Sequence, residues 1–168
     1  MTLDEINAFD RRQFVAALGA IFEHSPWIAE RAFDARPFAS VDELHAAMLR
    51  AMRDATRDEQ VALIRAHPEL AGRAMVRNEL TADSTTEQAG AGLTSCSPAE
   101  YARLVELNAR YNAKFGFPFI LAVKGYDRAG VIAEFARRVE RDPEDEFAEA
   151  LAQIARITGL RLRALVAD

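Results

Sequence analysis

Repeated helix-start signals restrict the fold of this sequence more than any other feature. Ser97-Pro98-Ala99-Glu100 combines an N-cap serine, a proline at the first helical position and the glutamate of a capping box. Ser40-Val41-Asp42-Glu43 is a second capping box, and Ser25-Pro26 repeats the serine–proline start. Asp142-Pro143 begins an acidic first turn, which suits the positive end of a helix dipole. These starts along one chain favour a helical architecture.

The hydrophobic pattern between these starts has the period of an α-helix. Alanine is the commonest residue, and runs in which Val, Ile or Thr alternate with polar residues are nearly absent. We therefore predict an all-α fold, a single-domain compact bundle of eight or nine helices. The expected helices cover residues 10–23, 26–35, 41–54, 57–66, 68–76, 85–92, 98–115, 128–141 and 143–166.

Length and composition limit the number of domains and the classes of partner. A domain typically takes about 150 residues, so this chain is expected to form one domain over residues 1–168. The chain is 50% hydrophobic and 28% charged, which argues against disorder and against membrane spanning. Its net charge of −5 has the wrong sign for binding through phosphate contacts, so no nucleic-acid partner is expected.

Cysteine and histidine usage bears on compartment and metal binding. Cys96 is the single cysteine, so no internal disulfide can form and a reducing, cytoplasmic location is expected. The first residues are acidic and no unbroken apolar stretch follows, so no secretory signal is expected. His24, His45 and His67 lie far apart without i, i+4 pairing, so no metal site is expected.

His67 is the first candidate for chemistry. Pro68 disfavours helical geometry in the residue before it, which places His67 at a break between two helices. An imidazole can give and take a proton near neutral pH, as general acid–base catalysis requires. His67 also continues the apolar face of Leu63 and Ile64, so a structural histidine in the core remains the alternative.

A second cluster lies around residues 84–93. Helical spacing puts Ser84, Glu87 and Gln88 on one face, at i, i+3 and i+4. Ser84 and Glu87 also have the spacing of a capping box, which is the structural alternative. Gly90 and Gly92 would each cost about 1 kcal/mol inside a helix, so a close approach of backbone or ligand is expected there.

Arg161 lies on the apolar stripe of the C-terminal helix. The stripe steps by four and three residues through Phe147, Leu151, Ile154, Thr158, Arg161 and Leu165. A buried guanidinium needs an anionic or carbonyl partner, because desolvating its charge alone is costly. The partner is either a buried acid or a bound ligand, and the sequence leaves both open.

The apolar run from Phe117 to Val123 is interrupted by Pro118 and is too short for a helix. We predict an extended, buried segment here. A packed core segment is the simpler interpretation. If the segment is extended, its backbone groups are also available to bind a flat polar ligand.

Together these residues resemble the 2-oxo-4-hydroxy-4-carboxy-5-ureidoimidazoline (OHCU) decarboxylase family, which catalyses the last step from urate to allantoin. The resemblance covers nearly the whole chain in several ordered motifs. These are Phe14-Val15-Ala16-Ala17-Leu18-Gly19, Phe22-Glu23-His24-Ser25-Pro26-Trp27, His67-Pro68-Glu69-Leu70, Leu80-Thr81, Ser84 with Glu87-Gln88, Ala91-Gly92-Leu93 and Phe115-Gly116-Phe117-Pro118-Phe119. The family implies an all-α homodimer that converts OHCU to (S)-allantoin and CO2 without metal or organic cofactor.

The resemblance also implies a role for each candidate residue. His67 is expected to be the catalytic acid/base, with Glu87 as its catalytic partner. The expected substrate-binding residues are Pro68, Ser84, Gln88 and Arg161, with backbone groups from Phe119, Ile120, Leu121 and Val123. The pathway implied is urate degradation within purine metabolism, and the substrate is a small molecule.

Two other classes of function remain as alternatives. A non-catalytic helical protein-binding module explains the helices but not why a histidine, a Glu-Gln pair and an inward arginine should share a pocket. A metal-dependent hydrolase of helical type requires a His/Asp ligand set, for which the sequence offers only scattered candidates.

Overall fold

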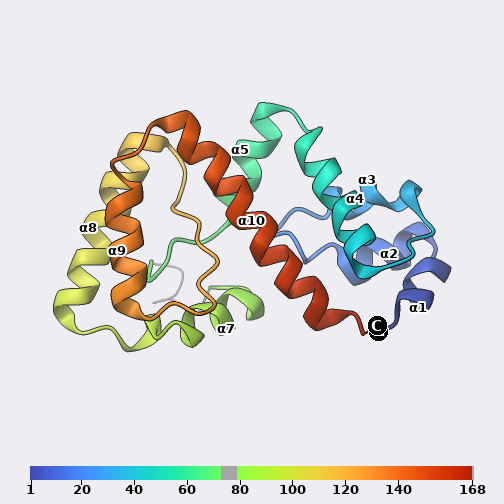
Figure 1. Cartoon of the computed structure of the whole chain (residues 1–168), viewed down its shortest axis with the longest axis horizontal. Helices are drawn as coiled ribbons and strands as arrows, with labels where there is room; N and C mark the ends of the chain where they lie inside the picture. The colour runs from blue at the N-terminus through green and yellow to red at the C-terminus, as the bar shows by residue number, and fades with distance from the viewer. Residues whose placement is uncertain (73–78, 168) are drawn as a thin grey trace. The chain divides into compact units, whose positions relative to one another are not determined.

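The computed structural model describes residues 1–72 and 79–167 of the chain. Within these residues it contains nine α-helices and two 3-10 helices (Figure 1). The described residues form no strand, and their only β-type pairing is an isolated bridge between Thr2 and Ala167. The predicted all-α fold is therefore confirmed.

By their internal contacts the helices divide into two compact units. The first joins residues 1–66 to residues 154–168, and the second comprises residues 67–153. The long helix α10 (Pro143–Leu165) contributes its first part to the second unit and its last part to the first. One domain over the whole chain stays a prediction.

The first unit consists mainly of short helices, and those after Thr2, Asp10 and Ser40 begin at side-chain caps, whereas the one after Pro26 does not. They are α1 (Leu3–Ala8), α2 (Arg11–Leu18), α3 (Trp27–Ala32), the 3-10 helix η1 (Phe33–Ala35), α4 (Val41–Arg53) and α5 (Arg57–Ala66). Thr2 and Asp10 begin α1 and α2 with complete capping boxes. In the core, the ring of Phe14 meets that of Phe33 edge-on, with centroids 5.5 Å apart.

The second unit packs an aromatic core between its helices. They are α7 (Ala82–Gly90), the 3-10 helix η2 (Leu93–Ser95), α8 (Pro98–Phe115), α9 (Arg128–Arg138) and the first part of α10. Ser97 begins α8 with the predicted capping box. Tyr111, Phe119 and Phe135 are fully buried together, and the rings of Phe119 and Phe135 stack with centroids 3.9 Å apart.

Most predicted helix ranges agree with the structure within a few residues, with three corrections. The short helix α1 was not predicted, although Thr2 and Glu5 form its capping box. The predicted helix 10–23 ends at Leu18. The predicted helix 68–76 is wrong at its start, since residues 68–72 lie outside any helix and residues 73–76 lie outside the described residues.

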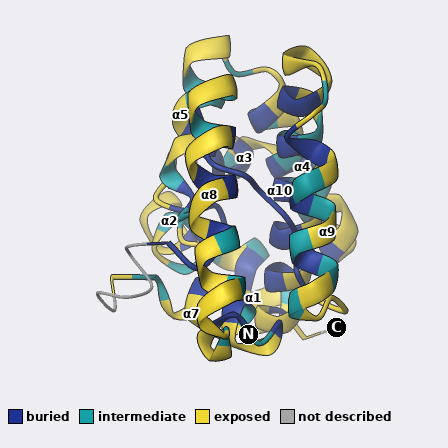
Figure 2. Cartoon of the chain, turned by 90° about the vertical axis from the view of Figure 1, so that its left-hand side faces the viewer, coloured by how far each residue is buried: buried dark blue, intermediate teal, exposed yellow. Residues whose placement is uncertain are grey.

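The segment between α8 and α9 is buried without being helical, as predicted. Residues 117–123 belong to no helix, and Phe117, Phe119, Ile120, Leu121 and Val123 are at most 6% exposed. Figure 2 shows this stretch in dark blue between α8 and α9, whose outer faces are exposed. A non-helical backbone inside a helical core needs partners for its polar groups, which the neighbouring side chains supply.

Candidate active site

His67 lies directly after α5, at the helix break that Pro68 predicts. The residue is buried, with 6% of its surface exposed. Such a position shields an imidazole from bulk water while keeping it on a turn rather than within a helix. The structure therefore satisfies the geometric expectation for His67, and both the catalytic and the structural interpretation are compatible with its burial.

Two amide side chains hold the backbone that follows His67. Gln88 accepts a hydrogen bond from the Ala71 N–H at 2.9 Å and donates a long one to the Glu69 carbonyl at 3.4 Å. Asn108 donates to the Leu70 carbonyl at 3.0 Å. Ala71 has a φ of +50°, a left-handed conformation that is rare outside glycine and is fixed here by these bonds.

Asn112 extends this amide cluster, because its Nδ2 donates to Glu69 Oε1 at 2.6 Å. Asn108 and Asn112 were not among the predicted site residues. They lie one turn apart on α8, and Asn108 interrupts an otherwise apolar buried face formed by Leu104, Leu107 and Tyr111. A polar residue on a buried helix stripe was the available signal.

The face of α7 predicted to carry polar groups is present. Ser84 and Gln88 are buried, at 4% and 2% exposure, and Glu87 is half-buried beside them. The capping-box interpretation of Ser84 is wrong, because α7 begins at Ala82 and its N-cap is Thr81, whose side chain accepts from the Ser84 N–H. Ser84 is therefore not the N-cap, and it lies in the first turn of the helix.

Gly90 and Gly92, the two glycines after this cluster, differ in how closely other atoms approach them. Gly92 has a φ of +75°, and a Cβ there would lie 3.2 Å from Arg128 Nη1. No atom lies within 4 Å of a Cβ built on Gly90, the last residue of α7. The close approach expected from the sequence therefore holds at Gly92, where the neighbour is Arg128.

The buried segment 119–123 is held by side chains from α9 and α10. Arg138 donates to the Ile120 carbonyl at 2.7 Å, and Gln153 accepts from the Ala122 N–H at 2.9 Å. Arg138 is paired in turn with Glu146, which also accepts from the Tyr111 hydroxyl at 2.6 Å. Burial and the Glu146 carboxylate raise the pKa of Tyr111, so its hydroxyl stays protonated.

Arg161 belongs to the first unit, whereas the other predicted site residues belong to the second. Arg161 Nη1 lies 2.8 Å from Glu23 Oε2, and both side chains are nearly inaccessible, at 5% and 2% exposure. Glu23 is thus a buried acid that pairs with Arg161, which is one of the two kinds of partner that the sequence left open. Its turn is set by His24, an exposed residue with a φ of +48°, and by Ser25, whose hydroxyl donates to the Glu23 carbonyl.

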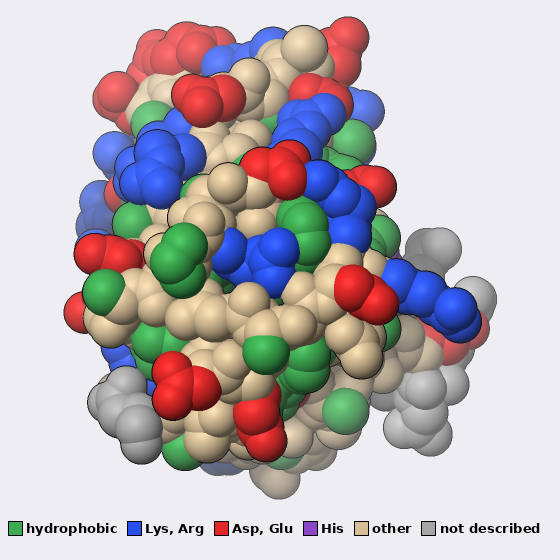
Figure 3. Space-filling model, turned by 90° about the vertical axis from the view of Figure 1, so that its right-hand side faces the viewer, with side chains coloured by type: hydrophobic (Ala, Val, Ile, Leu, Met, Phe, Trp, Pro, Cys, Tyr) green, Lys and Arg blue, Asp and Glu red, His purple; other side chains and the backbone are tan. Residues whose placement is uncertain are grey.

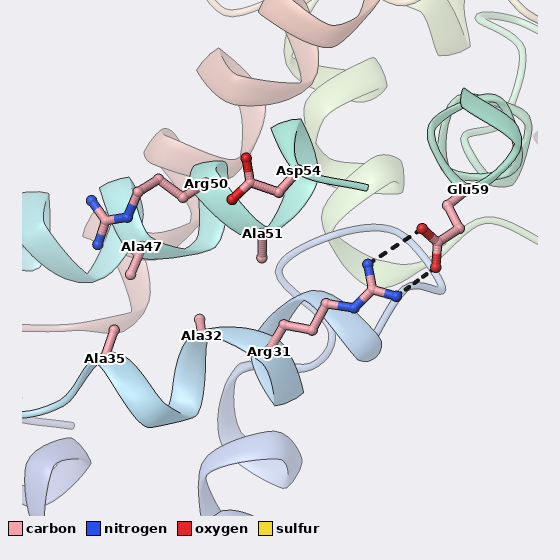
Figure 4. A pocket seen from close by; sticks show the side chains of 8 residues that line it. All are labelled: Arg31, Ala32, Ala35, Ala47, Arg50, Ala51, Asp54 and Glu59. Carbon is pink, nitrogen blue, oxygen red and sulfur yellow. Dashed lines mark hydrogen bonds and ion pairs between the residues drawn. The ribbon is translucent and has the colours of Figure 1, made fainter. Parts of the chain in front are cut away.

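Two cavities formed by described residues have no predicted site residue in their lining. One of about 420 Å³ lies against the amide cluster and is lined in part by Glu69, Asn108 and Asn112. The other, of about 510 Å³, is shown in Figure 4. There alanines of α3, η1 and α4 face one another, and Arg31 reaches across to Glu59.

Unlike the buried polar groups, the charged side chains of the surface are not gathered into one cluster on the face that Figure 3 shows. On the face drawn in Figure 3, Lys and Arg side chains are interspersed with Asp and Glu, and hydrophobic side chains are scattered.

In the described residues, no three His, Cys, Asp or Glu side chains converge as they would around a metal ion. No helix in those same ranges is long and apolar enough to cross a membrane.

The fold and these groups define an all-α protein with a buried histidine, followed by a turn that is hydrogen-bonded to a polar helix face. A sequence model described as OHCU decarboxylase matches residues 7–163. The chain therefore belongs to the OHCU decarboxylase family, whose members are carboxy-lyases.

Individual proteins that are similar to this chain support the same family assignment. The chain is 46% identical over 162 residues to an OHCU decarboxylase of Haloferax volcanii, covering 96% of this chain and 94% of that protein. It is 40% identical over 166 residues to an OHCU decarboxylase of Mus musculus, covering 99% and 93%. Among solved structures, an (S)-allantoin synthase matches with a TM-score of 0.79 at 28% identity, covering 99% of this chain and 54% of that one.

Proposed function

We propose that this chain decarboxylates OHCU to (S)-allantoin and CO2, as a carboxy-lyase of urate degradation. The observation that carries the proposal is the family match over residues 7–163. This chain covers 94% and 93% of the two relatives that carry the family's name, so the similarity is not limited to a shared fragment.

The reaction places one demand on the protein that His67 is suited to meet. The carboxylate of the substrate is next to a ring imine, which accepts the electrons as CO2 leaves. The resulting ene-amine must then be protonated on one face to give a single enantiomer, and this requires an acid in a fixed position. We assign that role to His67, because it is buried and its following turn is clamped by Gln88 and Asn108.

The remaining assignments follow the family pattern. Glu87 would orient or polarise the imidazole, or bind the hydroxyl beside the departing carboxylate. Gln88 uses its carbonyl oxygen on Ala71 and one Nε2 hydrogen on the Glu69 carbonyl, so its second Nε2 hydrogen would donate to the substrate. Pro68, Ser84 and Arg161 would line the substrate, Arg161 by holding its polar oxygens.

We extend the proposal to backbone groups of Phe119, Ile120, Leu121 and Val123 as further substrate contacts. The segment is buried and non-helical, so its N–H and C=O groups are not used up by a helix ladder. We also propose a cytoplasmic homodimer that needs no metal or organic cofactor, as the family pattern implies.

The proposal is tested by circular dichroism of the allantoin formed when OHCU is generated from urate by the two preceding enzymes. The unassisted reaction gives a racemate, so fast optical activity of the S enantiomer is the expected result with this protein. A slow, racemic product from folded protein would contradict the proposal and favour the helical binding module. Activity that survives a strong chelator would exclude the metal-dependent hydrolase.

His67→Ala tests the assigned acid. One positioned acid/base typically contributes about 10²- to 10⁴-fold, so kcat should fall by at least the lower figure. The variant should melt close to the temperature of the wild-type protein. Unchanged kcat in the variant would remove His67 from the catalytic role.

A further inference from the structure

The buried segment 119–123 poses a problem that its neighbours solve in an unusual way. Its backbone lies in the core of the second unit without a helix or a sheet ladder. Buried N–H and C=O groups without partners are strongly destabilising, so such a segment needs directed contacts from side chains. Two side chains, Arg138 and Gln153, supply them.

Arg138 fixes the first point of the segment. Its Nη1 donates to the Ile120 carbonyl at 2.7 Å, while Nε and Nη2 lie 2.6 and 2.5 Å from Glu146 Oε1. The guanidinium also lies over the ring of Phe119, 4.4 Å from its centroid. Arg138 and Glu146 are both completely buried, so the plane of the guanidinium is held on three sides.

Gln153 fixes the second point. Its Oε1 accepts from the Ala122 N–H at 2.9 Å, and its Nε2 donates to Glu149 Oε1 at 2.6 Å. The Glu149 carboxylate can only accept, so it sets which end of the Gln153 amide faces the segment. Gln153 is itself 3% exposed.

The two contacts define one edge of the segment. The Ile120 carbonyl and the Ala122 N–H are two residues apart, and in extended backbone such groups point to the same side. Both are taken by side chains of α9 and α10. The extended geometry that the sequence predicts for this segment turns the N–H and C=O of Leu121, between them, to the opposite edge.

We propose that Arg138 and Gln153 are positioning residues for the decarboxylation, which fix the segment so that the backbone of Leu121 faces the substrate. This inference rests on the proposed function, in which residues 119–123 bind the substrate. Stability alone does not account for the buried ion pair, because a well-packed apolar pair stabilises a core equally well. A guanidinium offers directed donors in one rigid plane, which suits it to holding a carbonyl in place.

Gln153→Leu is the decisive variant, because it removes the Ala122 contact and leaves the Arg138–Glu146 pair intact. We expect KM for OHCU to rise by about tenfold, as for the loss of binding energy from one well-placed hydrogen bond. Amide hydrogen exchange of a peptide covering 117–123 should become faster in the same variant, measured without substrate. That second readout does not depend on activity.

Two further variants control this experiment. Lys114→Met removes bonds to the carbonyls of Val139 and Arg141, in the same unit but off the segment, and should leave KM within about twofold of wild type. Gln153→Glu combined with Glu149→Gln exchanges acceptor and donor while keeping an acceptor for Ala122, and should restore KM. If Gln153→Leu does not fold, Gln153→Asn takes its place, because a side chain shorter by one methylene group no longer reaches the Ala122 N–H.

The outcomes separate the two proposals. If the wild-type protein gives no (S)-allantoin, the proposed function is wrong, and the inference that rests on it is overturned with it. If the wild type is active and folded Gln153→Leu keeps its KM, only the inference is overturned. A raised KM without faster exchange of 117–123, or the same rise in Lys114→Met, overturns it as well.

Discussion

Two buried arginine–glutamate pairs, one in each unit, are alike in chemistry and different in what surrounds them. Arg138 and Glu146 are completely inaccessible, and the guanidinium also holds the Ile120 carbonyl. Arg161 and Glu23 lie 2.8 Å apart at 5% and 2% exposure, and Arg161 Nη1 also lies 3.5 Å from the Ile21 carbonyl. The first pair orders a segment of backbone, whereas the second holds an arginine that we assign to the substrate.

The difference shows that burial of an arginine does not by itself identify a ligand site. Arg138 is the more deeply buried of the two, yet its contacts are with its own chain. Removing one partner of a buried pair leaves the other charge without compensation in either case. The pairs should therefore respond alike in stability, and kinetics measured once stability is restored would test the separate role of each arginine.

The largest effect is expected for Arg138→Met. This change leaves Glu146 buried without its main cation and should cost about 3–5 kcal/mol of unfolding free energy. Adding Glu146→Leu removes the stranded charge and should recover most of that loss. Urea denaturation of the single and double variants measures both values, and a double variant no more stable than the single one would contradict this account.

Arg161→Met strands Glu23 in the same way, but should cost slightly less, about 3 kcal/mol, because this pair is 5% and 2% exposed whereas Arg138 and Glu146 are completely buried. Here the second change, Glu23→Leu, should restore the melting temperature without restoring KM for OHCU. Arg161 would then have a role in binding beyond its ion pair. Recovery of KM together with stability would show that Arg161 serves only to balance Glu23.

The sequence identified those site residues whose signal is local. Pro68 marks the break at His67, and the i, i+4 spacing of Ser84 and Gln88 puts both on the buried face of α7. The periodic stripe found Arg161 in the same way. Such patterns depend on neighbours within one or two turns, which is the range over which helix geometry can be read from sequence.

The sequence missed residues whose partners are distant along the chain. Glu23 lies 138 residues from Arg161, and Gln153 lies 31 residues from Ala122. Arg138 ends α9, where a basic residue is expected for the helix dipole alone and so gave no signal of burial. Only the tertiary arrangement within each unit shows that these side chains meet.

Asn108→Leu tests whether the turn after His67 depends on side chains as the segment 119–123 does. The change leaves the Leu70 carbonyl without its 3.0 Å donor and should cost about 1–3 kcal/mol. Because the turn also carries His67, kcat should fall by about tenfold even where the variant is fully folded. Asn112→Ala is the matched control, since it removes contacts to the Glu69 side chain and to the Asn108 carbonyl of its own helix, and leaves the bonds to the Ala71 N–H and the Leu70 carbonyl intact. Equal kcat in wild type and Asn108→Leu would disprove the dependence.

The smallest effect is expected at His45, a polar contact of the first unit that involves no ion pair. His45 Nε2 lies 3.0 Å from Thr158 Oγ1, and burial, followed by the nearby Arg163, lowers the pKa of His45 below its usual 6.5. Arg53 lowers the pKa further, and Asp42 opposes it.

The lowered pKa fixes the direction of the pH effect. Below about pH 6.5 the unfolded chain binds a proton at His45 more readily than the folded chain does. His45 therefore contributes its stabilisation above that pH, and this stabilisation is lost as the pH falls. Because the side chain is only half-buried, the loss should stay below about 1 kcal/mol. Urea denaturation at pH 8 and pH 5 should show a smaller pH dependence for His45→Asn than for wild type. Identical dependence in the two proteins would mean that His45 does not couple folding to pH.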